Sequence, residues 1–389
     1  MRRQLAPYLV MGLWVSACAT TPSYQCDLNA VEFKTDFESG QLNTVSCDTN
    51  GYRIVISPEN TPINNSPWYA FDIMGAENIT VPITLVYEGG THRYSPKLQK
   101  GDGSWQDITD TVFVTEDKSS ARFNITPASD SVRIAAQPII DTQDHLAWMR
   151  EKARLNFVKL DQIGQSVEEQ PIFKLEEVDA PLADKPYVVI IGRQHPPEVT
   201  GAQALIPFVD TIWNDSALSQ RFRDEYNLIV IPLINPDGVL KGHWRHNVSG
   251  LDLNRDWGPF TQPETQAAQN EFRRFESGQD DIVLFLDFHS TWRNLIYTQT
   301  DEEPTVPADF TRNWIDRVKA KLTDDVYAFT REANTTSDRP VSKNYMYRTY
   351  GVPAMTFEVG DDTSVAAIEA ASQVFAEEMM TLLLEEASR

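Results

Sequence analysis

The sequence predicts an all-β antiparallel sandwich domain followed by an α/β domain, whose mixed, mostly parallel sheet has helices on both faces. A chain of 389 residues that is 41% hydrophobic can form two substantial cores. Residues 27–140 alternate short β-rich segments with turn residues, which is typical of a sandwich. From residue 141 to residue 389, apolar segments alternate with amphipathic segments of helical period, which is typical of an α/β domain.

The sandwich prediction depends on segments rich in β-branched and aromatic residues. They are residues 31–37, 52–56, 68–74, 79–87, 111–115 and 121–125. Turn sequences such as Thr49-Asn50-Gly51 and Gly101-Asp102-Gly103 separate them. Since this region shows no cluster of titratable groups, we expect it to be structural or to present a substrate.

The α/β prediction depends on a second set of segments. The expected strands are residues 187–192, 227–234, 282–288, 294–298, 326–330 and 354–359. The expected helices are residues 265–275, 308–322 and 364–386, with another helix that begins near Val199. Side chains at the carboxyl ends of parallel strands meet at one edge of the sheet, where such folds bind ligands.

The first residues resemble a bacterial lipoprotein signal. Two arginines precede an apolar segment, residues 5–15, that is too short to span a bilayer, and Val15-Ser16-Ala17-Cys18 follows. We expect residues 1–17 to be a signal peptide, Cys18 to carry the lipid, and residues 18–26 to form the anchor and linker. Ala19 resembles the sorting pattern for the outer membrane, which predicts a lipid-anchored envelope protein on the periplasmic side. An ordinary signal peptide cut elsewhere is the alternative.

The two remaining cysteines, Cys26 and Cys47, suit a disulfide in an oxidising compartment. Such a bond would stabilise the fold by about 3 kcal/mol. Two free thiols are the alternative. No Cys-x-x-Cys motif is present, so the sequence does not indicate a cysteine zinc site.

The charge of the chain excludes some partners. A formal net charge of −22, from 56 acidic and 34 basic residues, disfavours attraction to nucleic acid or to an anionic membrane surface. No stretch after the first residues is apolar and long enough to span a membrane. The sequence indicates no obligate protein partner.

Imidazole and carboxylate side chains follow the apolar strand 187–192. His195 and Glu198 are three residues apart in Arg193-Gln194-His195-Pro196-Pro197-Glu198. This spacing lets both reach one divalent ion, and nitrogen with oxygen ligands suits zinc. His-x-x-Glu alone is a weak signal, because it occurs by chance in many chains.

Four further motifs follow in order along the chain. The turn Asn235-Pro236-Asp237-Gly238 closes the strand 227–234, and residues 250–257 read Gly-Leu-Asp-Leu-Asn-Arg-Asp-Trp. His289 ends the apolar strand 282–288, and Glu358 is a lone carboxylate in the apolar strand 354–359. His289 alone is typical of a core histidine, and Glu358 alone of a buried carboxylate paired with arginine.

Taken as an ordered set, these motifs resemble the zinc carboxypeptidases of the M14 family, over most of residues 145–389. The earlier region is similar to the amino-terminal β-domain of the cytosolic-carboxypeptidase branch. That similarity is carried by residues 37–42 (Phe-Glu-Ser-Gly-Gln-Leu), by Trp68-Tyr69, and by Tyr94-Ser95-Pro96 leading to Asp102-Gly103-Ser104-Trp105.

The resemblance implies that His195, Glu198 and His289 bind one Zn²⁺ per chain. Three protein ligands leave a coordination position open, as in catalytic zinc sites. It implies that Glu358 is the general base, whose pKa burial would raise and zinc would lower. Arg245 would polarise the scissile carbonyl and stabilise the oxyanion.

The resemblance also implies how the substrate is held. Asn254 and Arg255 would bind the terminal carboxylate of peptide or protein C-termini, which makes the enzyme an exopeptidase. Asp252 would accept the second ring proton of His195. For Arg245 and Asp252 considered singly, an exposed-loop position is the alternative.

Two features concern the substrate pocket. Lys343, if it points inward, would pair with an acidic C-terminal residue, in keeping with the deglutamylating tendency of the branch; a solvated surface lysine is the alternative. The family often supplies a mobile tyrosine upstream of the base. Residues 332–344 contain none, and Tyr345 and Tyr347 are the nearest candidates, so this role stays open.

The resemblance therefore implies a zinc metallocarboxypeptidase. The alternative enzyme is a zinc amidohydrolase acting on N-acyl amino acids or cell-wall peptides, since deacylases share several of these motifs. The turn at Asn235 and the sandwich domain favour the carboxypeptidase. A peptide-binding module that has lost catalysis is the third hypothesis, which the intact ligand and base set disfavours.

Overall fold

The structure is a computed structural model that describes residues 31–177, 185–277 and 281–388. The predicted signal peptide, Cys18 and Cys26 lie outside these residues. Cys47 takes part in a disulfide, and its predicted pairing with Cys26 stays a prediction. Within the part of the chain that the structure describes, no helix has the length and apolar character needed to cross a membrane.

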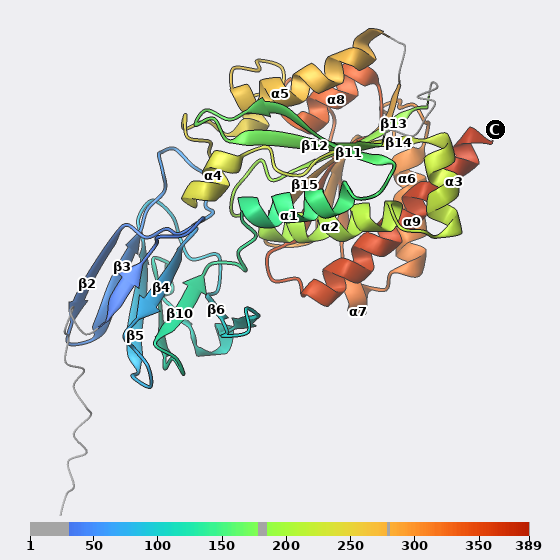
Figure 1. The fold of residues 1–389 in the computed structure, drawn as a ribbon. Coiled ribbons are helices and arrows are strands. Elements are labelled where there is room, and N and C mark those ends of the chain that lie inside the picture. Colours follow the sequence, from blue (N-terminus) through green and yellow to red (C-terminus); the bar gives the residue numbers. More distant parts are fainter. Residues whose placement is uncertain (1–30, 178–184, 278–280, 389) are drawn as a thin grey trace, which may run out of the picture.

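Residues 32–135 form two five-stranded sheets that make the first domain (Figure 1). The first sheet contains, in spatial order, β1 (Glu32–Lys34), β4 (Ala70–Met74), β10 (Ser131–Ala135), β6 (Lys97–Gln99) and β7 (Trp105–Asp107). The second contains β2 (Thr44–Asp48), β3 (Gly51–Ile56), β5 (Val81–Tyr87), β9 (Ser120–Ile125) and β8 (Phe113–Val114), and a 3-10 turn (Thr109–Thr111) precedes β8.

This domain confirms the predicted β-sandwich. Strand β5 shows the expected period of two, since Val81, Ile83, Leu85 and Tyr87 are buried and the residues between them are partly exposed. One departure concerns direction, because β3 and β5 run parallel whereas the other paired strands of these two sheets are antiparallel. Strands β2, β6, β7 and β10 are short additions that the sequence pattern did not predict.

An eight-stranded mixed sheet forms the centre of the second domain. Its strands in spatial order are β11 (Val158–Gln165), β12 (Pro171–Glu177), β14 (Asn227–Ile231), β13 (Tyr187–Gly192), β15 (Ile282–Thr291), β18 (Ala354–Gly360), β16 (Leu295–Thr298) and β17 (Thr330–Ala333). The central strands β14, β13, β15 and β18 are mutually parallel. The pairs β11–β12, β12–β14 and β16–β18 are antiparallel.

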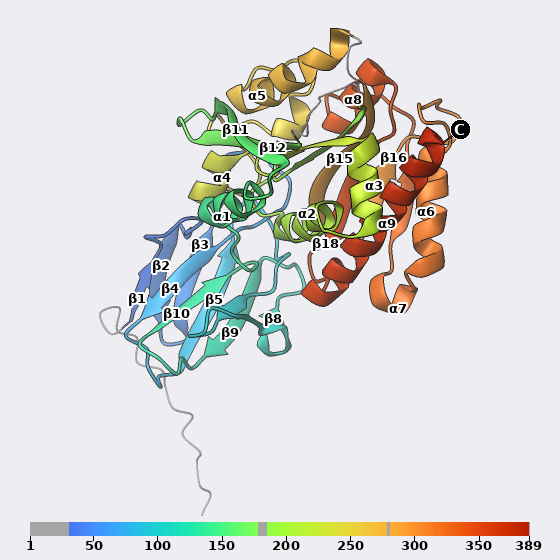
Figure 2. The same cartoon turned by 45° about the vertical axis from the view of Figure 1, so that its right-hand side comes forward.

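Helices cover both faces of this sheet, as predicted (Figures 1 and 2). They are α1 (Thr142–Lys152), α2 (Val199–Ile212), α3 (Ala217–Glu225), α4 (Pro236–Lys241), α5 (Pro263–Phe272), α6 (Phe310–Lys321), α7 (Asp324–Tyr327), α8 (Ser342–Tyr350) and α9 (Val365–Ala387). Strand β13 is buried on both sides: Val188 and Ile190 pack with α2, while Val189 and Ile191 pack in the core that contains α5. A central parallel strand that is covered on both faces has apolar residues at nearly every position, as β13 does.

One strand prediction needs correction. Residues 326–327 form the end of the one-turn helix α7, residues 328–329 belong to no helix or strand, and residue 330 begins β17. Asp324 and Asp325 occupy the first turn of α7, where acidic residues interact favourably with the helix dipole. Strands β11 and β12 were not predicted, because polar residues interrupt their apolar pattern.

The central strands place the predicted chemical groups at one edge of the sheet. Gly192 at the end of β13 lies in register with Phe288 on β15, and His289 lies in register with Glu358 on β18. Paired residues of neighbouring parallel strands project from the same face. His289 and Glu358 therefore lie side by side, and the loop after β13 enters the same region.

Candidate metal centre and active site

The loop after β13 is a sharp turn that presents two side chains. Arg193 adopts φ +55°, and Glu198 occupies the N-cap position of α2. The neighbouring turn supports this loop, because the backbone N–H of Ile234 donates to Gly192 O and that of Asn235 donates to Arg193 O, each at 3.2 Å. The sequence therefore brings His195 and Glu198 to the same side of the turn.

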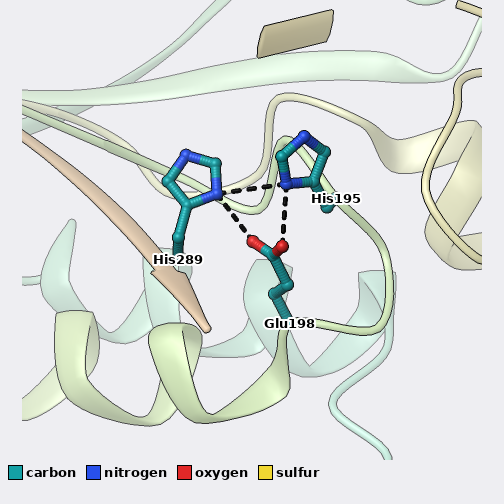
Figure 3. A group of neighbouring side chains, drawn as sticks. All are labelled: His195, Glu198 and His289. Carbon is teal, nitrogen blue, oxygen red and sulfur yellow. Dashed lines mark hydrogen bonds and ion pairs between the residues drawn. The ribbon is translucent and has the colours of Figure 1, made fainter. Parts of the chain in front are cut away.

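His195, Glu198 and His289 converge in a buried cluster (Figure 3). The Nδ1 atoms of the two histidines are 3.1 Å apart. One carboxylate oxygen of Glu198 lies 2.8 Å from Nδ1 of His195, and the other lies 2.6 Å from Nδ1 of His289. The three predicted ligands are thus brought together from the β13–α2 loop and from β15.

Each histidine of this cluster is oriented by an aspartate. Nε2–H of His195 donates to Asp252 Oδ1 at 2.9 Å, and Nε2–H of His289 donates to Asp287 Oδ2 at 2.9 Å. A neutral imidazole that donates from Nε2 presents a lone pair at Nδ1. The hydrogen bonds therefore direct both lone pairs toward Glu198.

A zinc ion fits this donor set. Two imidazole nitrogens and a carboxylate converge on one point, an arrangement that a cation stabilises. Donor separations of 2.6, 2.8 and 3.1 Å approach the edge of a tetrahedron around zinc, which is about 3.3 Å for bonds of about 2.0 Å. Nitrogen and oxygen ligands in this number leave a position for a water molecule or a substrate.

Asp252 connects the cluster to Arg245. Its Oδ2 accepts a hydrogen bond from Arg245 Nε at 2.8 Å, while Oδ1 accepts from His195. Burial opposes the charge on Asp252, but His195, Arg245 and Arg255 hold its pKa well below its usual range. The carboxylate therefore stays ionised and fixes both the imidazole and the guanidinium.

Asn254 and Arg255 lie beside this network. The Asn254 side chain is buried, and its Oδ1 accepts from the backbone N–H of Ser342 at the start of α8 at 2.9 Å. Arg255 donates from NH1 to Asn254 O at 2.6 Å, and 31% of its side chain is exposed. The guanidinium therefore keeps donors available toward the cavity.

Glu358 projects into the same cavity from β18. Its Oε2 is buried and accepts no hydrogen bond from the described residues. Burial raises the pKa of Glu358 to about 7. A carboxylate with this pKa and an unoccupied acceptor oxygen can take up and release a proton near neutral pH.

A cavity of about 480 Å³ unites these groups. Its basic lining side chains are Arg93, Arg245, Arg255, Arg339 and Lys343, and its acidic lining side chains are Glu198 and Glu358. In a chain of net charge −22, this is a local concentration of positive charge. A larger and more open groove of about 750 Å³ runs along α2 and α9, and the described residues that line it include no histidine.

Lys343 is buried in the first turn of α8, so it is not a surface lysine. Its Nζ donates to Thr298 O at 3.3 Å. Burial lowers the pKa of Lys343 to about 8, and Glu303 opposes this shift. The tyrosines proposed from the sequence lie elsewhere, since Tyr345 and Tyr347 pack against the core around Trp257.

Several residues of the site were not predicted, and Asp287, Tyr297 and Arg93 are examples. Asp287 is entirely buried behind His289, and its position two residues earlier on the same strand face was the only available signal. Tyr297 on β16 lines the cavity. Arg93 reaches the cavity from the sandwich domain and binds Asp361 through Nε at 2.8 Å and NH2 at 3.1 Å. No local pattern identifies contacts between distant segments of this kind.

Comparison with known families agrees with this geometry. The zinc carboxypeptidase family, Peptidase M14, matches residues 145–381. The chain belongs to the M14 family. M14 metallocarboxypeptidases use zinc, and the His195–Glu198–His289 cluster supplies the ligands that such a metal needs.

Among curated M14 relatives, cytosolic carboxypeptidases are similar to this chain. Cytosolic carboxypeptidase 3 of Mus musculus is 24% identical over 302 residues, covering 69% of this chain and 30% of the mouse protein. Cytosolic carboxypeptidase 2 of Homo sapiens is 30% identical over 304 residues, covering 67% of this chain and 33% of the human protein. The alignments thus span about a third of the length of these two relatives.

Solved structures share the fold of this protein over nearly the whole chain. A metallo-carboxypeptidase from Burkholderia cenocepacia superposes with a TM-score of 0.76 at 21% identity, covering 92% of this chain and 99% of that one. A metallo-carboxypeptidase from Pseudomonas aeruginosa, in complex with (2-guanidinoethylmercapto)succinic acid, gives a TM-score of 0.74 at 21% identity, covering 91% and 99%. The combination of sandwich and α/β domains is therefore found in bacterial metallo-carboxypeptidases.

Proposed function

We propose that this protein removes single residues from peptide C-termini, with Glu358 as general base and with a preference for acidic terminal residues. The observation that carries the proposal is the convergence of a three-ligand metal cluster, an acceptor carboxylate and a set of cationic side chains in one cavity. A zinc ion held there by His195, Glu198 and His289 would activate a water molecule and polarise a carbonyl group.

The chain's own residues supply the remaining chemistry. Glu358 takes a proton from the attacking water and transfers it to the leaving amine, a role that its raised pKa suits. Arg245, held by Asp252, places a fixed positive charge where the oxyanion develops. A donor of this kind is typically worth about 3 kcal/mol in the transition state.

Recognition of a C-terminus follows from the cationic lining. Arg255 and Asn254 bind the terminal carboxylate, and Lys343 pairs with an acidic side chain. A free C-terminus is required in this scheme, so amidated peptides should not be cleaved.

The test is a mass-spectrometric assay of the protein from about Thr21 onward, supplied with zinc. Free peptides should lose one C-terminal residue, and amidated peptides should stay intact. Cleavage of N-acyl amino acids alone would support an amidohydrolase instead. Retained peptide binding without any turnover would indicate a binding module.

Replacement of the base gives a sharper test. Glu358→Gln should lower kcat by at least about 10³-fold, because the amide accepts no proton, while the zinc content measured by metal analysis stays at one ion per chain. Gln is isosteric with Glu, so the fold is retained. Wild-type turnover in this variant would overturn the assignment of the base.

We also propose, from the sequence alone, that the protein is exported and lipid-anchored through Cys18. The apolar segment ending at Val15-Ser16-Ala17-Cys18 supports this. In a Gram-negative host, Cys18→Ser should move the protein from the membrane fraction to the soluble fraction. If the variant and the wild-type protein had the same distribution between the two fractions, Cys18 would not be the membrane anchor.

A further inference from the structure

The loop that carries Arg245 is held by the sandwich domain. It runs from Gly242, the left-handed cap of α4, to Asp252, and contains no helix or strand of its own. Its internal backbone hydrogen bonds, from Asn247 N–H to Leu251 O and from Gly250 N–H to Asn247 O, lie after residues 244–246. The backbone N–H groups of residues 244–246 donate to an acceptor outside the loop, so the support for this part of the backbone comes from its surroundings.

Glu59, in the segment between β3 and β4, supplies that support. Its Oε2 accepts the backbone N–H of Trp244 at 2.8 Å, and its Oε1 accepts those of Arg245 at 3.0 Å and His246 at 2.7 Å. Three successive amides directed at one carboxylate form an anion-binding nest, and hydrogen bonds to a charged acceptor are stronger than neutral ones.

Further contacts hold the same loop at two other points. The neighbouring Asn60 donates from Nδ2 to Gly250 O at 2.8 Å, and its Oδ1 contacts the ring of His246. Trp244 is 1% exposed and packs in the core of the sandwich domain. Arg245 therefore has its backbone fixed by the sandwich domain and its guanidinium fixed by Asp252.

We propose that Glu59 is a positioning residue of the reaction, which holds the backbone of residues 244–246 so that Arg245 meets the developing oxyanion. This inference rests on the proposed role of Arg245. A catalytic group displaced by about 1 Å can lose about 100-fold in rate. Glu59 lies in the sandwich domain, so that domain is part of the catalytic machinery and not only a structural support.

The test is a double-mutant cycle with Glu59→Gln and Arg245→Ala. Glu59→Gln keeps the size of the side chain but replaces an acceptor oxygen by a donor group. We expect Glu59→Gln to lower kcat about 10- to 100-fold, and Arg245→Ala to lower it about 100- to 1,000-fold. The KM of Glu59→Gln and its zinc affinity should stay within about twofold of wild type. In the Arg245→Ala background, Glu59→Gln should have no further effect, because residues that act as a unit are not additive.

Glu88→Gln is the matched control, since Glu88 is an exposed carboxylate beside Ser57 in the same region, and this variant should retain wild-type kcat.

An equal loss of kcat from Glu59→Gln in the wild-type and Arg245→Ala backgrounds would show general structural damage and overturn the proposal. If Glu59→Gln kept the wild-type kcat while Arg245→Ala lowered kcat, the proposed role of Glu59 would be refuted and the role of Arg245 would stand. Wild-type kcat in Arg245→Ala would instead refute the proposed role of Arg245. Glu59→Asp, which keeps the charge, should recover part of the lost kcat.

Discussion

The ligand histidines are each paired with a carboxylate, and these pairs determine which ring nitrogen faces the metal. Asp252 reaches His195 from a distant loop, whereas Asp287 lies two residues before His289 on β15. Asp287 is also held in place, because its Oδ2 accepts from Gln194 Nε2 at 2.6 Å and from the hydroxyl of Ser342. The orientation of His289 thus depends on contacts with the β13–α2 loop and with α8.

Removal of the charge behind His289 should weaken metal binding. Asp287→Asn should raise the zinc dissociation constant about 10- to 100-fold, because the neutral amide no longer favours a proton at Nε2 of His289. Competition titration with a chelating dye measures this directly. Asp309→Asn is the control, since Asp309 is an exposed aspartate on the surface. Equal zinc affinity in wild type and Asp287→Asn would contradict the prediction.

The charge on Lys343 predicts a pH dependence of substrate preference. Its pKa is lowered to about 8 by burial, so the ammonium is charged below that pH and neutral above it. A peptide ending in Glu should be favoured over one ending in Gln by about tenfold in kcat/KM at low pH, and this advantage should fade as the pH rises through about 8. The ratio of kcat/KM reports the pKa of the free enzyme.

Two substitutions control this experiment. Lys343→Arg should keep the advantage to higher pH, because guanidinium stays protonated. Lys343→Met should remove it at every pH. A ratio that does not vary with pH in the wild-type protein would show that Lys343 does not recognise the acidic side chain.

The sequence revealed those site residues that belong to motifs with a fixed position relative to a strand. His195 and Glu198 follow an uninterrupted apolar strand, and His289 and Glu358 lie at or near the ends of two others. Glu59 and Arg93 gave no such signal, since each contacts a residue that is more than a hundred positions away in the sequence. Contacts of that kind depend on the packing of two domains, which local periodicity does not encode.

Among the elements, α2 and β15 are in close contact at Gly201 and His289, beside the metal cluster. Gly201 lies in the first turn of α2, and a Cβ atom there would lie 2.7 Å from His289 O and 2.8 Å from its carbonyl carbon. The hydroxyl of Ser290 joins the same two elements, because it accepts from Gly201 N and from Thr200 Oγ1, each at 2.8 Å. The glycine therefore lets Glu198 and His289 come within reach of one ion.

Gly201→Ala should separate these two elements. Backbone atoms must move to accept the methyl group, which should cost about 1–3 kcal/mol of the free energy of unfolding and also lower zinc affinity. Thermal melting and metal titration measure the two effects. Gly101→Ala is the control, because no atom lies within 4 Å of the Cβ position at Gly101. Unchanged stability and zinc affinity in Gly201→Ala would show that the contact is not limiting.

The elements that the sequence predicted well are those with one dominant physical cause. Strand β13 matches residues 187–192 because burial on both faces requires an apolar residue at every position. Strand β11 was missed because it lies near the edge of the sheet and is mostly exposed or half-buried. The expected strand at residues 326–330 was wrong because a short helix and a strand share that segment.

At the scale of the whole molecule, the α/β domain contributes residues to the core of the sandwich domain, and both domains line one cavity. Val199 from α2 and Trp244 from the Arg245 loop pack in the core of the sandwich domain. Ser39 donates from its backbone N–H to Leu240 O and from its hydroxyl to Val239 O, at 2.8 and 2.7 Å. We propose that the fold changes from β-sandwich to α/β between residues 140 and 141. The functional site uses residues from both sides of this boundary.

The cationic cavity lies in a molecule whose net charge is −22, so long-range and short-range forces on an acidic peptide oppose each other. Salt screens the distant repulsion over a Debye length of about 8–10 Å but affects the buried contacts much less. The second-order rate constant for acidic peptides should therefore rise as ionic strength increases from about 10 to 150 mM, while that for cationic peptides should fall. If kcat/KM fell for both acidic and cationic peptides as ionic strength rose, the charge of the cavity rather than that of the outer surface would determine the rate of association. In dilute buffer the acidic surface would thus delay the arrival of the very substrates that the cavity binds best.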